Sequence, residues 1–189
     1  ICAEGGSAGK KIAFSDIVIC RFTKTRLERI GGSILYQNVA SNSELTESRS
    51  LFAFTRGGVE GLLLITNNKM YIDDGGGWQD YTPATAMVDA TDWTFDQYGD
   101  VIIVTSLSNV PYLLMPTGTQ FVVFANWPAT YKVGRIFAYK NFLIAVNIEI
   151  SGDKQNGFVA WSDVVIDGDA RIVEWSPLPT NLAGTNILP

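Results

Sequence analysis

The chain has 189 residues, and 47% of them are apolar, enough for one sizeable hydrophobic core and too many for a wholly disordered chain. Only 17% are charged, with a net charge of −5, which suits a surface partly covered by partners and disfavours non-specific binding to nucleic-acid phosphates. Histidine is absent, which excludes Ser-His-Asp and Cys-His nucleophiles, histidine-ligated zinc and histidine pH switches.

Residues 1–50 are predicted to form an N-terminal arm with strands that contribute to the core of a larger assembly. The glycine-rich segment 5–11 lacks the spacing of a phosphate-binding P-loop. Glu4 occupies the position of its first glycine, and Lys11 occupies the position of its Ser/Thr. We therefore expect a flexible arm there rather than a nucleotide site.

The two cysteines, Cys2 and Cys20, form neither a CxxC pair nor a zinc quartet. Two free thiols in a reducing compartment are expected, and a disulfide between them stays open. The basic stretch 21–29 is interpreted as a solvated or partner-facing strand, with nucleic-acid contact as the alternative. No apolar run approaches the ~20 residues of a membrane helix, and no signal segment opens the chain. These features predict a soluble protein assembled in a cytoplasm, without a membrane anchor.

From residue 51 onward the pattern is typical of β-structure. Short runs of Ile, Val, Leu, Phe and Tyr alternate with clusters of Gly, Asn, Asp and Pro. No long segment has helical periodicity, and residues 84–92 are expected to form a loop. The predicted fold class is all-β.

Three runs that are apolar at nearly every position begin at Leu62, Val101 and Phe142, about 40 residues apart. Each follows an aromatic strand and precedes two further strands, of which the last are expected at 78–81, 120–124 and 171–175. Four strands in about 40 residues is the period of a β-propeller blade. The sequence therefore predicts an array of about three four-stranded antiparallel blades, at roughly 51–83, 93–126 and 134–177.

Three blades are fewer than the four of the smallest common propeller. We therefore expect residues 51–189 to be part of a larger propeller or of a longer polypeptide. A β-sandwich of short strands is the alternative, because it spaces its turns similarly.

Residues 71–78 resemble the Asp-box, Ser/Thr-x-Asp-x-Gly-x-x-Trp, with Tyr71 in the hydroxyl position. In such a turn the carboxylate of Asp73 accepts backbone N–H groups, Gly75 permits positive φ, and Trp78 packs behind the turn. The turn is expected between the third and fourth strands of a blade. We predict a structural role for it, and neither a catalytic nor a metal-binding one.

Other residues are candidates for chemistry. Asp73–Asp74 and the acidic pair at 167–169 lack the spacing of an EF-hand, so turns are favoured over calcium sites and no cofactor is expected. Paired carboxylates would suit a glycosidase, and four tryptophans would suit a sugar-binding surface, although packing between blades explains the latter equally well. The carboxylate candidates are Glu60, Asp80, Asp96, Asp100, Glu149, Asp163 and Glu174. The tryptophans are Trp93, Trp127, Trp161 and Trp175.

Residues 17–32 read IVICRFTKTRLERIGG, which resembles the start of a group of bacteriophage virion proteins. In that group an N-V-R-F strand precedes a basic turn that ends in E-[KR]-[IR]-G-G. Four later stretches are similar in the same order, and the resemblance covers roughly residues 15–178. They are GLLLITNNKMY at 61–71, TFDQYGDVIIVT at 94–105, YKNFLIA at 139–145 and VAWSD at 159–163.

The similar proteins are β-propeller tail components, the tail nozzle or hub of short-tailed phages. The resemblance implies a virion protein, assembled in the host cytoplasm, that forms a six-fold homo-oligomeric ring extending the tail tube. Such a ring meets the adaptor ring on one side and fibres or spikes on the other, and viral DNA passes through its channel. It implies no catalytic residue. The alternative function is a propeller that binds or hydrolyses a host cell-surface polysaccharide.

Overall fold

The computed structural model describes residues 20–22, 27–29, 47–165, 170 and 173–188. The chain divides into two compact units, residues 1–43 and 44–189. In the first unit the described residues form an antiparallel pair of strands, β1 (Cys20–Phe22) and β2 (Leu27–Arg29). The predictions for the segment 5–11, the two cysteine side chains, the side chains of 21–29 and the acidic pair at 167–169 lie outside the described residues.

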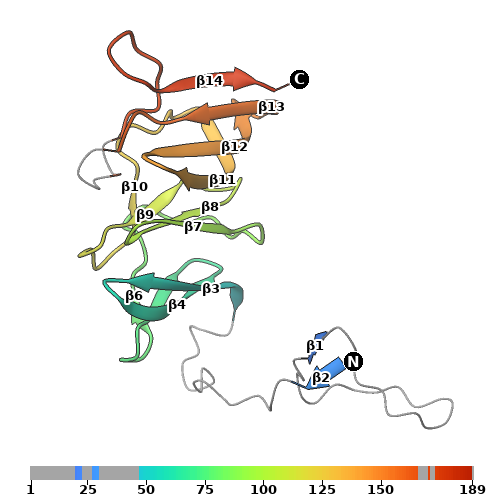
Figure 1. Ribbon diagram of the computed structural model, residues 1–189, viewed down its shortest axis with the longest axis vertical. Helices are drawn as coiled ribbons and strands as arrows, with labels where there is room; N and C mark the ends of the chain where they lie inside the picture. Colours follow the sequence, from blue (N-terminus) through green and yellow to red (C-terminus); the bar gives the residue numbers. More distant parts are fainter. Residues whose placement is uncertain (1–19, 23–26, 30–46, 166–169, 171–172, 189) are drawn as a thin grey trace, which may run out of the picture. The chain divides into compact units, whose positions relative to one another are not determined.

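The second unit consists of three four-stranded antiparallel sheets, and its described residues contain no helix, which confirms the all-β prediction (Figure 1). Each sheet is a meander in which consecutive strands are neighbours. Residues 84–92 form the expected loop between the first two sheets.

The first sheet is β3 (Ser48–Arg56), β4 (Val59–Thr66), β5 (Met70–Asp73) and β6 (Gln79–Asp80). The second is β7 (Thr94–Tyr98), β8 (Val101–Thr105), β9 (Tyr112–Leu114) and β10 (Val122–Val123). The third is β11 (Tyr131–Tyr139), β12 (Phe142–Ile150), β13 (Asp153–Trp161) and β14 (Gly184–Ile187).

Each sheet begins with a hairpin whose turn contains two residues. The strands close at Arg56↔Val59, Tyr98↔Val101 and Tyr139↔Phe142. In the first of these turns both glycines have positive φ, 58° at Gly57 and 77° at Gly58, as a twisted two-residue hairpin requires. Because the three turns have equal length, residues at the same distance from each turn are equivalent in the three sheets.

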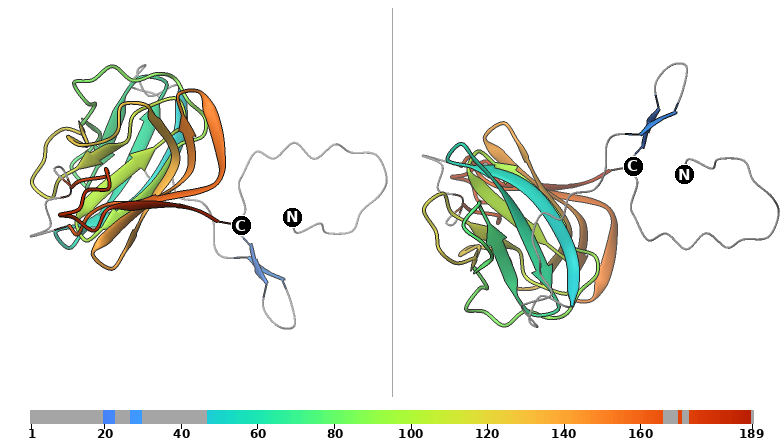
Figure 2. Two further views of the ribbon diagram at one scale, coloured as in Figure 1. Left: turned by 90° about the horizontal axis from the view of Figure 1, so that it is seen from above. Right: turned by 90° about the horizontal axis from the view of Figure 1, so that it is seen from below.

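The three sheets stack in chain order, and the views along the stack in Figure 2 show their strands overlapping. We call the face of a sheet that points toward the following sheet its forward face, and the opposite face its rear face. In β8 every residue is buried. Val101 and Ile103 lie in the core shared with the third sheet, whereas Ile102 and Val104 lie in the core shared with the first. The second sheet is therefore covered on both faces.

Strand alternation assigns the remaining residues to faces in the same way. The forward face of the first sheet packs against the rear face of the second through Phe54, Leu63, Ile65, Met70 and Ile72 on one side and Ile102, Val104, Tyr112 and Leu114 on the other. The forward face of the second sheet packs against the rear face of the third through Val101, Ile103 and Leu113 on one side and Ile136, Leu143, Ala145 and Ala160 on the other.

The predicted fourth strand of the third sheet is wrong. We expected it at 171–175, but the strand that pairs with β13 is β14, through Phe158↔Ile187 to Trp161↔Gly184. Of the expected strand, Val173 and Trp175 are buried in the core between the second and third sheets. The Trp175 ring packs edge-on against Trp127, with centroids 4.8 Å apart. The apolar residues at 173 and 175 reflect this burial and not strand pairing.

Candidate functional site

The turn at Asp73 joins β5 to β6, the third and fourth strands of the first sheet. Asp73 is 3% exposed, and its Oδ1 accepts the N–H groups of Gly75 at 2.8 Å and Gly77 at 3.1 Å. Both glycines have positive φ, 101° and 95°. Since one oxygen of Asp73 satisfies two backbone donors of the turn, the arrangement supports a structural role.

Trp78 follows the turn and packs on the rear face of the first sheet. It contacts Leu64 and Tyr71, which are 6% and 3% exposed and are cross-strand neighbours. Tyr71 occupies the hydroxyl position of the Asp-box, and here its ring is part of this small cluster. The three side chains cover part of a sheet face that would otherwise be exposed.

Among the described residues, no group of three or more His, Cys, Asp or Glu side chains gathers as metal ligands do. Asp74, next to Asp73, is exposed. Asp73 and Asp74 therefore do not belong to a cluster of carboxylates of the kind that helps bind a hard cation such as calcium.

Two of the carboxylate candidates bind the backbone of a neighbouring sheet. Asp96 Oδ2 accepts the N–H of Ala138 in the third sheet at 3.1 Å. Asp100 Oδ1 accepts the N–H of Gly57 in the first sheet at 3.0 Å. Ala138 lies on the edge strand β11, and Gly57 lies in the turn that follows the edge strand β3, so these carboxylates act as clamps between sheets.

Neutral side chains of the second sheet extend these clamps, and the sequence analysis missed them. Gln97 bonds both backbone groups of Thr55, accepting its N–H at 3.3 Å and donating to its carbonyl at 2.7 Å. Thr94 and Thr105 both donate to the carbonyl of Gly134, at 2.8 and 3.0 Å. The signal that could have found two of them is the three polar residues within the five of β7, Thr94, Asp96 and Gln97.

Two of the remaining carboxylate candidates, Asp163 and Glu174, are neighbours in the structure. Asp163 Oδ1 accepts the N–H groups of Val164 and Leu182. Glu174 accepts from the amide of Asn126 at 2.7 Å. The backbone N–H of Asp163 also donates to the carbonyl of Glu174 at 2.7 Å, so the structure brings these two candidates together. Glu60 and Glu149 lie on β4 and β12.

Asp80, on β6, forms an ion pair with Lys69, with Oδ2 and Nζ 3.4 Å apart, and accepts the N–H of Thr82 at 2.8 Å. Partial burial alone would raise the pKa of Asp80. The hydrogen bonds from Thr82 and the charge of Lys69 outweigh it, so the pKa lies below its usual value. Asp80 is therefore held ionised, which does not suit a general acid.

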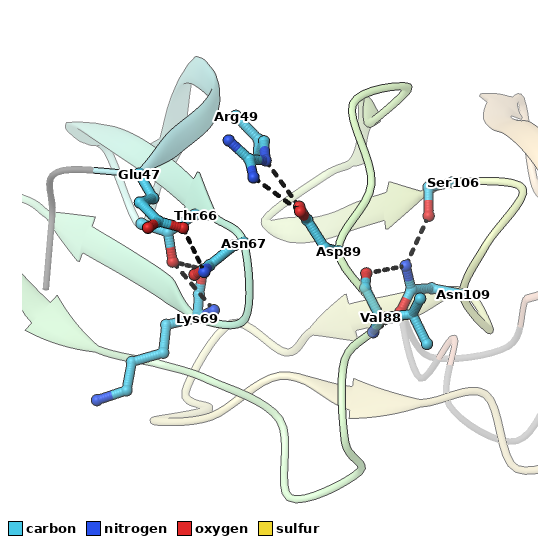
Figure 3. A network of polar contacts seen from close by, with 9 residues as sticks. All are labelled: Glu47, Arg49, Thr66, Asn67, Lys69, Val88, Asp89, Ser106 and Asn109. Atoms are coloured by element: carbon cyan, nitrogen blue, oxygen red, sulfur yellow. Dashed lines mark hydrogen bonds and ion pairs between the residues drawn. The ribbon is translucent and has the colours of Figure 1, made fainter.

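The loop between the first two sheets is held by a polar network (Figure 3). Arg49 on β3 forms a bidentate pair with Asp89, both N···O distances being 2.7 Å. On the other side of the loop, Asn109 accepts from the N–H of Val88 at 2.7 Å, and donates to the carbonyl of Val88 and to Ser106. The hydrogen bond from Arg49 lowers the pKa of Asp89 below its usual value. This network positions the loop.

Three of the four candidate tryptophans lie in the stack. Trp93 and Trp175 are buried, and Trp127 packs against the core between the second and third sheets. Trp161 is different, because it lines an apolar hollow of about 390 Å³ on the forward face of the third sheet. The hollow is lined by Tyr139, Phe142, Ile144, Val159, Trp161 and Leu182.

Two contacts of Trp161 fix the wall of the hollow. Trp161 Nε1 donates to the carbonyl of Leu182 at 2.8 Å, which fixes the ring and the loop together. Gly184 lies against the Trp161 ring so closely that a Cβ there would overlap it. No lining residue is charged, and Tyr139 is the one lining side chain with a hydroxyl group, so the hollow suits an apolar surface.

No model of a known protein family matches this chain, and no curated protein matches it. In the part of the chain that the structure describes, no helix has the length and apolar character needed to cross a membrane.

Proposed function

We propose that this chain is a structural subunit of a phage tail nozzle or hub, and that its three sheets are blades of a β-propeller. The observation that carries the proposal is the repeated stack. Three consecutive four-stranded meanders, begun by equal two-residue hairpins, present equivalent faces in the same direction. The phage assignment adds the resemblance of residues 15–178 to tail propellers.

The route of the chain supports the propeller interpretation. The last strand of the first sheet leads through one loop to the first strand of the second, and the same holds from the second sheet to the third. A propeller repeats its four-stranded blades in this order. The clamps from Asp96 and Gln97 join the first strands of successive sheets, where blades meet closely.

The use of the carboxylates supports a structural role. Asp73, Asp96 and Asp100 bond backbone groups of a turn or of a neighbouring sheet. A glycosidase needs two carboxyl groups about 5 to 9.5 Å apart across a bound sugar. Residues already committed to backbone donors serve that chemistry poorly, which favours the virion protein over the glycan-acting alternative.

The net negative charge of the chain supports a role in a ring through which DNA passes. With a net charge of −5, the subunit repels phosphate, so DNA slides past it without the counterion release that would hold it on a basic wall. The six-fold ring, its contacts with the adaptor ring and the fibres or spikes, and its location in the virion are the partners and place that the resemblance implies.

Immunogold electron microscopy tests the proposal. Antibodies raised against the full chain should label the tail end of phage particles that carry it. A glycan array and a polysaccharide hydrolysis assay should both be blank, and the chain should show no measurable duplex DNA binding at physiological salt. Labelling confined to the capsid, or sequence-independent DNA binding, contradicts the tail-ring role. Turnover of a cell-surface polysaccharide supports the alternative function instead.

A further inference from the structure

The third sheet contains a bulge in β13. Residues 156–158 lie opposite Asn147 alone, because the regular pairs with β12 stop at Gln155 and resume at Val159. On the other side of β13, pairing with β14 begins only at the third residue of the bulge. The first residue, Asn156, therefore has no partner residue in the described strands on either side, and its side chain is exposed.

The residue after Asn156 must be a glycine. Gly157 has a φ of 73°, a backbone conformation that disfavours any side chain. Its carbonyl accepts the N–H of Leu188 at 2.7 Å, and a Cβ on Gly157 would lie 2.6 Å from the carbonyl oxygen of Leu188. The bulge thus requires the one Asn-Gly pair of the sequence and places it at an exposed position.

An Asn-Gly pair contains both partners of a cyclisation. The backbone nitrogen of Gly157 forms a bond to the side-chain amide carbon of Asn156, the C–NH₂ bond breaks, and the displaced nitrogen leaves as ammonia with the N–H proton. Water then adds to one of the two carbonyls of the cyclic imide and breaks its C–N bond, which gives aspartate or isoaspartate. Glycine favours the first step because no Cβ shields the attacking nitrogen.

We propose that Asn156 is a site of spontaneous deamidation in the folded protein, with water as the other reactant. The reaction needs a backbone that can bring the nitrogen onto the amide carbon, and an interrupted ladder restrains the backbone less than regular pairing does. Asn109 is the contrast, because it is buried and its amide is bonded to Val88 and Ser106. The proposal concerns the chain itself and does not depend on a phage role.

The modification would act on β14. Isoaspartate adds a carbon to the main chain immediately before Gly157, and a carboxylate that is charged above a pKa of about 3.9. The next two residues hold β14 in place, Gly157 through the N–H of Leu188 and Phe158 through its pairing with Ile187. We therefore expect isoaspartate at 156 to loosen β14 from β13.

The test keeps the full chain folded at physiological temperature for several days, at mildly alkaline and at mildly acidic pH, and then measures tryptic peptides by mass spectrometry. Peptide 155–171 contains Asn156 as its one asparagine, and peptide 141–154 contains Asn141 and Asn147, each followed by a large residue. Peptide 155–171 should gain the mass of an amide-to-acid change at least about tenfold faster than peptide 141–154, and faster in alkali. Asn156→Gln, which would have to close a larger ring, is the matched control and should show no gain.

A second arm separates the effect of the fold from that of the dipeptide. If peptide 155–171 gains mass when the chain is unfolded in guanidinium chloride but not when it is folded, β13 protects Asn156 and the proposal is wrong. Equal rates in peptides 155–171 and 141–154 of the folded chain would also refute it. Hydrogen exchange measures the consequence, since the amides of β14 should exchange faster in the aged wild type than in aged Asn156→Gln. Unchanged exchange after complete conversion would overturn the expected loosening of β14.

Discussion

The forward faces of the second and third sheets carry similar residues in equivalent positions and differ in what lies on them. On the second sheet the face is closed by the third sheet, and Ile103 is 1% exposed. On the third sheet Ile144 lines a hollow next to Tyr139, which is 57% exposed. The comparison teaches that strand alternation determines which residues share a face, while the neighbouring element determines whether that face is buried.

The polar residues on the two sheets differ as well. The second sheet places Asp96 and Gln97 side by side on β7, so that one bonds the edge strand of the third sheet and the other bonds that of the first. At the equivalent positions of β11 the third sheet has Phe137 and Ala138. The second sheet is thus specialised to sit between two sheets, and the third sheet offers an apolar face without clamps.

The largest expected effect tests the comparison directly. Ile103→Asp places a carboxylate without a partner in the core between the second and third sheets, and should lower the free energy of unfolding by about 3–5 kcal/mol. Ile144→Asp, at the equivalent half-buried position of the third sheet, should cost no more than about 1 kcal/mol. Urea denaturation measures both. Equal costs at the two positions would mean that the forward face of the third sheet is also covered.

A smaller effect is expected at the turn that supports the rear face of the first sheet. Asp73→Ala removes the acceptor of the Gly75 and Gly77 N–H groups and should destabilise the protein by about 1–2 kcal/mol. Asp74→Ala, the exposed neighbour, is the control and should change stability little. Isothermal calorimetry should detect no calcium uptake by the wild-type protein. Stoichiometric uptake that is lost in Asp73→Ala would replace the structural role with a metal site.

The smallest effect concerns the exposed Arg49–Asp89 pair that holds the loop between the first two sheets. Because the folded-state pKa of Asp89 is lowered, its pairing stabilises the protein at pH values above the ordinary carboxyl pKa of about 3.9. The contribution disappears as the pH falls through the lowered pKa. Arg49→Gln should therefore melt slightly below the wild type at pH 7, and the two melting temperatures should converge as the solution is acidified toward pH 2. A constant difference across this range would show that the pair acts through packing.

Most strands of the second unit could be predicted, because their burial requires apolar residues that are visible in the sequence. The fully apolar run at 101–105 is β8, buried at every position, and the runs beginning at Leu62 and Phe142 lie in β4 and β12. Two-sided burial demands apolar residues at consecutive positions, so the pattern is unambiguous. The two-residue turns then set the register.

The fourth strand of the third sheet and the hollow could not be predicted, for a common reason. Val173 and Trp175 alternate as a strand would, yet the strand that pairs with β13 is the mostly exposed Gly184–Ile187. Leu182 reaches the hollow through a loop and a hydrogen bond from Trp161, about twenty positions earlier. Alternation of apolar residues indicates which side chains are buried, but it does not indicate which strand pairs with which. An edge strand in contact with water has few apolar residues, so its sequence shows little pattern.

The meander of the first sheet has a consequence for the newly made chain. All its strand pairs join residues within positions 48–80, so its contact order is low. Hairpins form in about 1–10 μs, whereas the ribosome adds about 5–20 residues per second. The first sheet can therefore pair fully several seconds before the second sheet leaves the ribosome. During that interval Leu63 and Ile65 are exposed to water on the growing polypeptide. Exposed apolar side chains of this kind are what a chaperone binds.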